Sequence, residues 1–142
     1  MGMGNIQTGF LLAGLYNAGI IMFSKGFGED LGRVDPLFDS GGSVGILLWG
    51  MAYASVCNRV EQVPLLSLVF AIEKAYYSQR WLRWMARHAS EALPALLKSD
   101  PLTGIFFSIY GTGDLMSMVF FLYCAYIFRG NAFRAAAVLK KA

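Results

Sequence analysis

Four long apolar runs, separated by short polar connections, dominate this chain. They cover about residues 6–24, 42–57, 63–80 and 103–128. A helix needs about 20 apolar residues to cross the hydrocarbon core of a bilayer, so the second and third runs are on the short side. Open β-structure is excluded at that depth because its edge groups would stay unpaired. The sequence therefore predicts an all-α, integral membrane four-helix bundle that forms a single transmembrane domain over residues 1–142.

The composition favours the same conclusion. Of the 142 residues, 56% are hydrophobic and 15% are charged, and the mean hydropathy is +0.50. Soluble domains carry about 25% charged residues, so a soluble chain of this kind would lack polar surface. The net charge of +3 is modest, and no basic face for a nucleic acid is evident. We expect a multi-pass membrane protein.

Two connections have their own expected structure. In the first, residues 25–41, Asp35 is placed to cap a short helix that Pro36 opens. Leu37 and Phe38 would then lie on the membrane surface. The second connection, residues 58–62, is tight, which predicts that helices two and three pack antiparallel.

Residues 81–98, between helices three and four, read as an interfacial amphipathic segment. Basic residues recur there and just before it at helical spacing: Arg80, Arg83 and Arg87. Trp81 and Trp84 supply the apolar side, and tryptophan beside arginine is typical of a membrane–water interface. Either helix three continues past the headgroups or the chain bends and lies flat, and Pro94 limits how far a regular helix can continue.

Charge does not decide the orientation in the membrane. One side would hold six basic residues: Lys25, Arg33, Arg80, Arg83, Arg87 and Lys98. The other would hold five: Arg59, Arg129, Arg134, Lys140 and Lys141. The positive-inside rule needs a clearer difference than this. An even number of spans places both termini on the same side, with residues 131–142 as a frayed helical end.

Polar residues near the middle of three runs are the main candidates for a site. A carboxylate at the bilayer centre costs roughly 2.5 to 3.5 kcal/mol, so such residues should face protein. Asn17 continues a small-residue stripe with Gly9 and Ala13, which favours an interhelical hydrogen bond. Asp114 lies beside Gly111 and a second glycine, at 113, which leave room for a partner side chain, a water or a ligand.

Helix three carries adjacent charges, Glu73 and Lys74. Lys74 lies about 100° around the helix from Glu73, which predicts that the two are not same-face neighbours. Asp114 is the expected partner of Lys74, because otherwise two charges would be uncompensated in a low dielectric. Tyr77 shares the face of Glu73. A structural ion pair that fixes helix register and a functional site remain alternatives.

Helix two has no central charge, but Trp49 and Tyr53 follow glycines near one face and could form the floor of a pocket. Ordinary packing is the favoured alternative for them. The candidate ligand-binding set is Asn17, Trp49, Tyr53, Glu73, Lys74, Tyr77 and Asp114.

Several chemistries are disfavoured. His88 is the single histidine, so a histidine metal site or bis-histidine haem within one chain is not expected. Cys57 and Cys124 form no CxxC pair, and two separate buried thiols are favoured over a disulfide. No nucleotide-binding or hydrolase motif appears. No cofactor is required, although a bound lipid or pigment would fit.

Three function classes remain. The favoured one is a small non-catalytic accessory or scaffold subunit or a lipophile-binding protein, whose partners are membrane lipid and other subunits or further copies of the chain. The alternative is a cofactor-independent, isomerase-like enzyme in which Glu73 and Asp114 act as acid and base on a sterol- or isoprenoid-like substrate. The third is a proton-coupled carrier that acts as an oligomer.

Overall fold

The computed structural model describes residues 2–139, with side chains for residues 2–131, and this part of the chain consists of helices joined by short turns, without strands. The prediction of an all-α fold is confirmed. The long helices are α1 (Met3–Met22), α3 (Ser40–Val56), α4 (Pro64–His88) and α6 (Pro101–Leu139). The short elements are α2 (Asp30–Val34), η1 (Pro36–Phe38), η2 (Cys57–Gln62) and α5 (Ala92–Ser99). Arg134, Lys140 and Lys141 lie outside the described side chains.

Three of the long helices, α3, α4 and α6, begin with a capping aspartate, a proline or both. Asp39 precedes α3, and its side chain accepts a hydrogen bond from the Gly42 backbone N–H at 2.7 Å. Pro64 is the first residue of α4. Asp100 precedes Pro101 at the start of α6 and accepts from the Thr103 hydroxyl. Carboxylates before the first turn and proline within it leave few unsatisfied N–H groups at a helix start.

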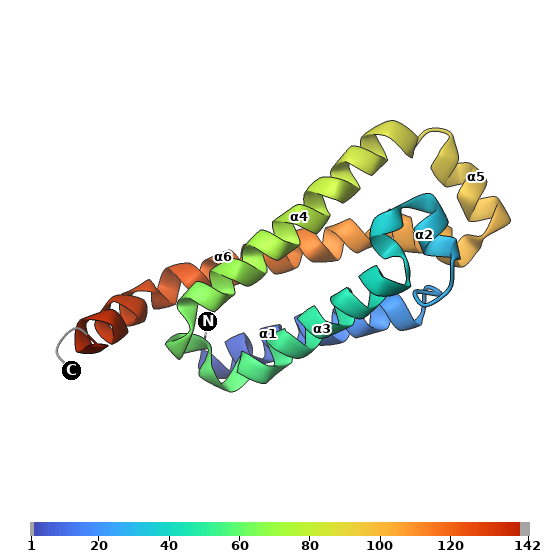
Figure 1. Cartoon of the computed structure of the whole chain (residues 1–142). Coiled ribbons are helices and arrows are strands. Elements are labelled where there is room, and N and C mark those ends of the chain that lie inside the picture. The colour runs from blue at the N-terminus through green and yellow to red at the C-terminus, as the bar shows by residue number, and fades with distance from the viewer. Residues whose placement is uncertain (1, 140–142) are drawn as a thin grey trace.

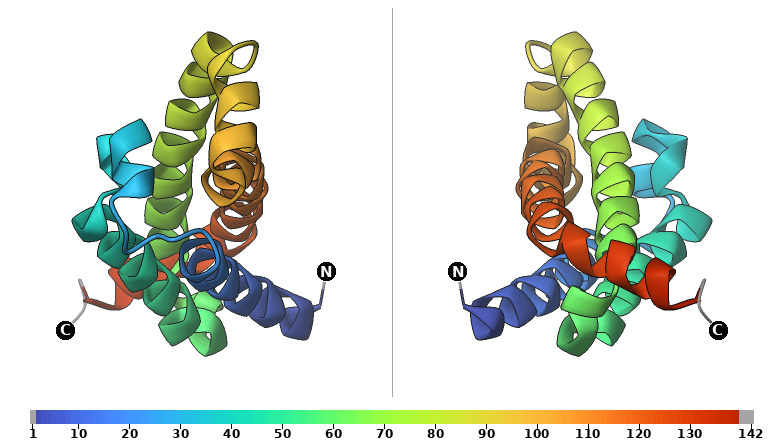
Figure 2. Two further views of the ribbon diagram at one scale, coloured as in Figure 1. Left: turned by 90° about the vertical axis from the view of Figure 1, so that its right-hand side faces the viewer. Right: turned by 90° about the vertical axis from the view of Figure 1, so that its left-hand side faces the viewer.

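The long helices are arranged as two pairs, α1 with α3 and α4 with α6, which splay apart towards α5 (Figures 1 and 2). The expected antiparallel packing of α3 along α4 is therefore wrong. Between them, η2 is a 3₁₀ segment with a non-helical residue, Arg59, and it turns α4 away from α3. These two helices meet instead through side chains such as Tyr53 and Glu73.

Glycines set the closest approach within the first pair. A Cβ added to Gly14 would lie 2.7 Å from the Gly50 carbonyl oxygen, and one added to Gly50 would lie 2.9 Å from the Gly14 carbonyl oxygen. No larger residue fits at either position without separating the backbones. This contact lies one turn from Asn17 and holds α1 close enough to α3 for Asn17 to reach it.

The predicted interfacial segment is divided between two helices. α4 continues to His88, and after a short turn α5 packs back against α6 (Figure 1). Trp81 packs against α6, and its indole N–H donates to the Phe107 carbonyl at 2.9 Å. Gly111 makes this possible, because a Cβ there would collide with the Trp81 ring. Pro94 falls in the first turn of α5, where its missing N–H costs little.

Phe38 corrects another expectation. Asp35 does cap the short helix η1, accepting from the Leu37 backbone N–H at 3.0 Å. Phe38, however, is 1% exposed instead of lying on the membrane surface. Its ring centroid is 4.9 Å from that of Phe106 and 4.8 Å from that of Tyr110. The first connection thus folds inward and closes the open end between the two helix pairs.

Cys57 and Cys124 are both free and buried. They belong to the same apolar cluster, together with Phe10, Phe70 and Phe121, at the end of the molecule opposite α5. The prediction of two separate buried thiols is confirmed.

Two helical stretches of the described chain, Ser40–Gln62 and Pro101–Asn131, are long and apolar enough to cross a membrane. A bundle of four membrane-spanning helices is thus not confirmed. The reason lies in polar residues of the other two helices. α1 contains Asn5, Gln7 and Asn17, and α4 contains Glu73 and Lys74 as well as a basic end.

Candidate functional site

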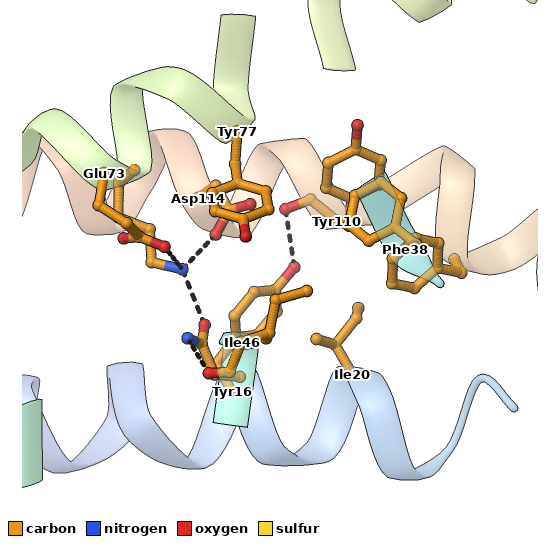
Figure 3. Close-up of a pocket in the computed structure, with 11 residues that line it drawn as sticks. Tyr16, Ile20, Phe38, Ile46, Glu73, Tyr77, Tyr110 and Asp114 are labelled. Carbon is orange, nitrogen blue, oxygen red and sulfur yellow. Dashed lines mark hydrogen bonds and ion pairs between the residues drawn. The ribbon is translucent and has the colours of Figure 1, made fainter. Parts of the chain in front are cut away.

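The candidate site is centred on the Lys74 ammonium group, which bonds to Asn17 of α1 and to Asp114 of α6. Figure 3 shows Glu73 and Asp114 on one side of this site and Tyr16 on the other. The Lys74 side chain is 2% exposed. Its Nζ donates to Asp114 Oδ1 at 2.6 Å and to Asn17 Oδ1 at 2.8 Å. The predicted pairing of Lys74 with Asp114 is present. Lys74 Nζ also lies 3.9 Å from Glu73 Oε1, so the expectation that these two neighbouring side chains stay apart is wrong.

Asn17 connects three helices. Its side-chain oxygen accepts from Lys74 on α4, and its Nδ2 donates to the Ile46 carbonyl of α3 at 3.0 Å. The predicted interhelical hydrogen bond of Asn17 is therefore present, and Asn17 makes a second one to another helix. Both polar atoms of a fully buried amide are satisfied, which avoids the cost of an unpaired group.

Glu73 is held by Tyr53, whose hydroxyl donates to Glu73 Oε2 at 2.5 Å. Among the described residues, no hydrogen-bond donor reaches the other oxygen, Oε1. The ring of Tyr53 also faces Lys74 Nζ, at 5.5 Å from the ring centroid, and that of Tyr77 does so at 5.9 Å. Aromatic faces at this distance attract a cation and contribute to holding the ammonium in place.

One ammonium and two carboxylates meet in this network, which gives a formal charge of +1 − 2 = −1 when all three are ionised. In a low dielectric the attraction within such a group is large, but so is the cost of removing each charge from water. Tyr53 stabilises Glu73, while Asn17 completes the coordination of Lys74. The network is thus a nearly closed set of donors and acceptors.

A small cavity adjoins the network. Its volume, as the space open to the centre of a water molecule, is about 10 Å³, close to what one water needs. It is lined by Tyr16, Asn17, Ile20, Phe38, Ile46, Glu73, Lys74, Tyr77, Phe106, Tyr110 and Asp114. A sterol or isoprenoid does not fit without rearrangement of these side chains.

Five of the seven predicted site residues line this cavity: Asn17, Glu73, Lys74, Tyr77 and Asp114. Tyr53 is connected to it through Glu73 but is not part of the wall. Trp49 lies elsewhere, and its ring packs edge-on against Phe70 with centroids 6.2 Å apart. Packing, the alternative favoured for Trp49, describes it better than a pocket floor.

Other wall residues were missed from the sequence, Tyr16 and Tyr110 above all. The Tyr16 hydroxyl donates to the Tyr110 carbonyl at 3.0 Å, while the buried Tyr110 hydroxyl has no partner among the described residues. The one sequence feature that pointed to a neighbour here was Gly113, because a Cβ at that position would collide with the Tyr16 ring. The room expected around Asp114 is thus filled by aromatic side chains.

A second ionic region, partly open to solvent, lies at the end with α2 and α5. Lys25 Nζ is 3.0 Å from Asp100 Oδ1, and an Arg80 nitrogen is 2.7 Å from Asp35 Oδ1. The hydrogen bond from the Thr103 hydroxyl, followed by that from Lys25, lowers the pKa of Asp100. The carboxylate of Asp35 raises the pKa of Arg80. These pairs join the first connection to the start of α6 and to α4.

Within the residues that the structure describes, no three side chains that commonly bind metals come together. No family model matches the chain, and neither a curated protein nor a solved structure matches it. The site therefore has to be interpreted from its own chemistry.

Proposed function

We propose that this chain is a small, non-catalytic, multi-pass membrane protein in which all four long helices lie in the bilayer. The observation that carries the proposal is the distribution of charge. The helical residues 3–22, 40–56, 64–79 and 101–128 contain only three charged side chains, those of Glu73, Lys74 and Asp114. All three turn inward to one network, so lipid would meet none of them.

The outward faces of these helices support the same placement. Each presents large apolar side chains, for example Leu15 of α1 (66% exposed), Met51 of α3 (67%), Ile72 of α4 (62%) and Met116 of α6 (70%). In the most apolar windows of α3 and α6, only 28% and 33% of the residues are buried. Core helices of a soluble protein would be mostly buried, whereas this exposed belt suits acyl chains.

Average hydropathy underestimates α1 and α4 because it counts a residue whichever way its side chain points. Asn17 and Lys74 are 1% and 2% exposed, so their polar groups face the protein interior and not the lipid. α1 has 20 residues, about 30 Å of helix at 1.5 Å per residue, which equals the thickness of a hydrocarbon core. Four spans would place both termini on the same side.

Within this proposal the ion network has a structural role: it fixes the two helix pairs relative to each other. The cavity beside it has room for about one water, which argues against a substrate-sized chamber. An apolar groove of about 400 Å³ between α1 and α6, lined in part by Gly9, Ala13 and Met116, opens outward instead. We therefore assign the protein a role as an accessory or scaffold subunit that contacts lipid and other membrane chains, or copies of itself, through its outer faces.

Membrane placement is tested by cysteine accessibility in sealed proteoliposomes. Leu15→Cys and Ile72→Cys should resist a membrane-impermeant maleimide, whereas Ser90→Cys, in the turn before α5, should react. Equal, rapid labelling of all three would contradict the proposal. The native cysteines are buried, so they add little background.

The subunit role is tested by native mass spectrometry of the gently extracted protein. We expect it to be recovered with another membrane chain or with further copies of itself. Recovery as a bare monomer under conditions that preserve other complexes of the same membrane would contradict a subunit role while leaving membrane placement intact.

One observation favours a second candidate, the isomerase-like enzyme. Glu73 Oε1 is buried without a hydrogen-bond donor among the described residues and borders the small cavity, as a proton-transferring group would. Glu73→Gln keeps the shape of the side chain. Loss of turnover on a sterol- or isoprenoid-like substrate in this variant, with the fold intact, would replace the non-catalytic proposal.

A further inference from the structure

A basic cavity lies at the end of α4, apart from the buried network. Its volume, on the same measure as above, is about 160 Å³, which is ample for a phosphate group. It is lined by Asp35, Arg80, Arg83, Trp84, Arg87 and His88. Three arginines at positions i, i+3 and i+7 of one helix therefore converge on one hollow, facing the connection that carries Asp35.

The charges in this cavity are unbalanced. Asp35 is the one carboxylate of the wall, and it is already engaged by Arg80 at 2.7 Å and by the Leu37 backbone N–H at 3.0 Å. Arg83 and Arg87 form no ion pair with another described residue. With His88 neutral, the wall carries a formal charge of +3 − 1 = +2. Two guanidinium groups thus remain available to an anion.

Packing holds one wall of the cavity in place. The Trp84 ring lies between Phe107, with centroids 4.7 Å apart, and His88, at 5.2 Å. Phe107 is itself fully buried in the core. The Arg80–Asp35 pair fixes another part of the lining. A ligand would therefore meet the packed Trp84 ring and the Arg80–Asp35 pair, with the exposed side chains of Arg83 and Arg87 beside them.

We propose that this cavity binds a phosphate group, with Arg83 and Arg87 as its principal ligands. Guanidinium groups donate pairs of parallel N–H bonds that match phosphate oxygens. The phosphate can belong to an anionic phospholipid headgroup or be free in solution. The lipid source rests on the proposed membrane placement, since the end of α4 would then lie at headgroup level beside Trp84. Binding of free phosphate does not depend on that placement.

The same residues could have a purely structural role, which is to offset the partial negative charge at the C-terminal end of α4. Arg87 and His88 lie in its last turn, where cations are favourable. That role requires no saturable ligand and no special importance of Arg83, which is a turn earlier. Saturable binding that depends on Arg83 and Arg87 separates the two roles.

The experiment uses the full chain in detergent and compares two charge-matched double variants. R83Q/R87Q removes the available guanidinium groups, and R33Q/K98Q removes two positive charges from the same end of the molecule but outside the cavity. One arm adds phosphatidylglycerol or phosphatidylcholine and measures retained lipid by native mass spectrometry and the shift in Tm. The other arm titrates inorganic phosphate at constant ionic strength and follows tryptophan fluorescence.

We expect the wild type to retain phosphatidylglycerol in preference to phosphatidylcholine, with binding about thirtyfold weaker in R83Q/R87Q and nearly unchanged in R33Q/K98Q. Saturable binding of inorganic phosphate that R83Q/R87Q abolishes would support the site and identify free phosphate as a ligand. Equal losses in both double variants would overturn the proposal in favour of diffuse charge attraction. The absence of saturable binding in both arms would overturn it as well, while labelling in proteoliposomes would still report membrane placement separately.

Discussion

The buried network and the solvated end contain ion pairs of the same length in opposite surroundings. Lys74 Nζ lies 2.6 Å from Asp114 Oδ1, with side chains 2% and 8% exposed, and an Arg33 nitrogen lies 2.6 Å from Glu29 Oε2, with side chains 70% and 83% exposed. Distance is therefore not what distinguishes them. Water screens the exposed pair and competes with it, whereas the buried pair has no substitute partner except its protein neighbours. The energetic importance of a charge in this chain should follow its burial.

The largest expected effect is that of Asp114→Ala. It leaves the Lys74 ammonium buried without its closest partner, and breaking a buried pair in this way costs about 3–5 kcal/mol. Unfolding of the variant by denaturing detergent in mixed micelles measures this loss. The double variant Lys74→Met/Asp114→Leu would still leave the Glu73 carboxylate buried without a cation, so we expect the triple variant Glu73→Gln/Lys74→Met/Asp114→Leu, which removes all three charges, to recover most of the loss.

The matched change at the solvated end is Glu29→Ala. We expect a loss of less than about 1 kcal/mol, as for other exposed pairs. Similar losses for Asp114→Ala and Glu29→Ala would break the comparison, because burial would then have no influence on the strength of the pair.

The next effect concerns the backbone contact that brings Asn17 to α3. Gly14→Ala places a Cβ 2.7 Å from the Gly50 carbonyl oxygen, and overpacking of this kind costs about 1–3 kcal/mol. Gly19→Ala is the control on the same helix, since nothing lies within 4 Å of a Cβ added there. The free energies of unfolding of both variants in mixed micelles test the importance of this contact. A larger loss of stability in Gly19→Ala than in Gly14→Ala would contradict it.

Asn17→Ala tests the polar connection itself. It removes the hydrogen bonds to Lys74 and to the Ile46 carbonyl, and hydrogen bonds between membrane helices are worth about 0.6 kcal/mol on average and about 1.7 at most. We expect a loss in this range by the same unfolding assay. Asn58→Ala, at an exposed position in η2, should have almost no effect. A loss above that of Asp114→Ala would make Asn17, not the ion pair, the centre of the network.

The sequence predicted the interior of the bundle better than its ends. Asn17, Lys74 and Asp114 could be placed together because a charge in an apolar run has few alternatives to a polar partner. The positions of Phe38 and Trp81 could not be predicted in this way. Both are amphipathic or apolar residues near an interface, where burial and membrane contact have similar free energies, and the direction of a turn decides between them.

Helix pairing was the other part that the sequence could not supply. A short connection between α3 and α4 normally favours contact between them, but η2 takes a 3₁₀ form with one non-helical residue and turns the chain away. The glycines beside Asp114, Gly111 and Gly113, indicated room for a neighbour without naming Trp81 or Tyr16, and the close approach of Gly14 to Gly50 was not predicted. A pattern along one helix tells which face is buried, while the partner is set by three-dimensional packing.

The smallest expected effect is the pH dependence of the solvated end. The pKa of Asp100 is lowered in the folded protein, first by the Thr103 hydroxyl and then by Lys25. The stabilisation is therefore complete above the unfolded pKa of about 3.9 and is lost as the pH falls through the lower folded value. Unfolding measured between pH 7 and pH 3 should show a weaker pH dependence in Asp100→Asn than in the wild type. Because the Thr103 hydrogen bond contributes most, Thr103→Val should reduce the pH dependence more than Lys25→Met does. The reverse order would show that, at this partly buried site, charge pairing outweighs capping of α6.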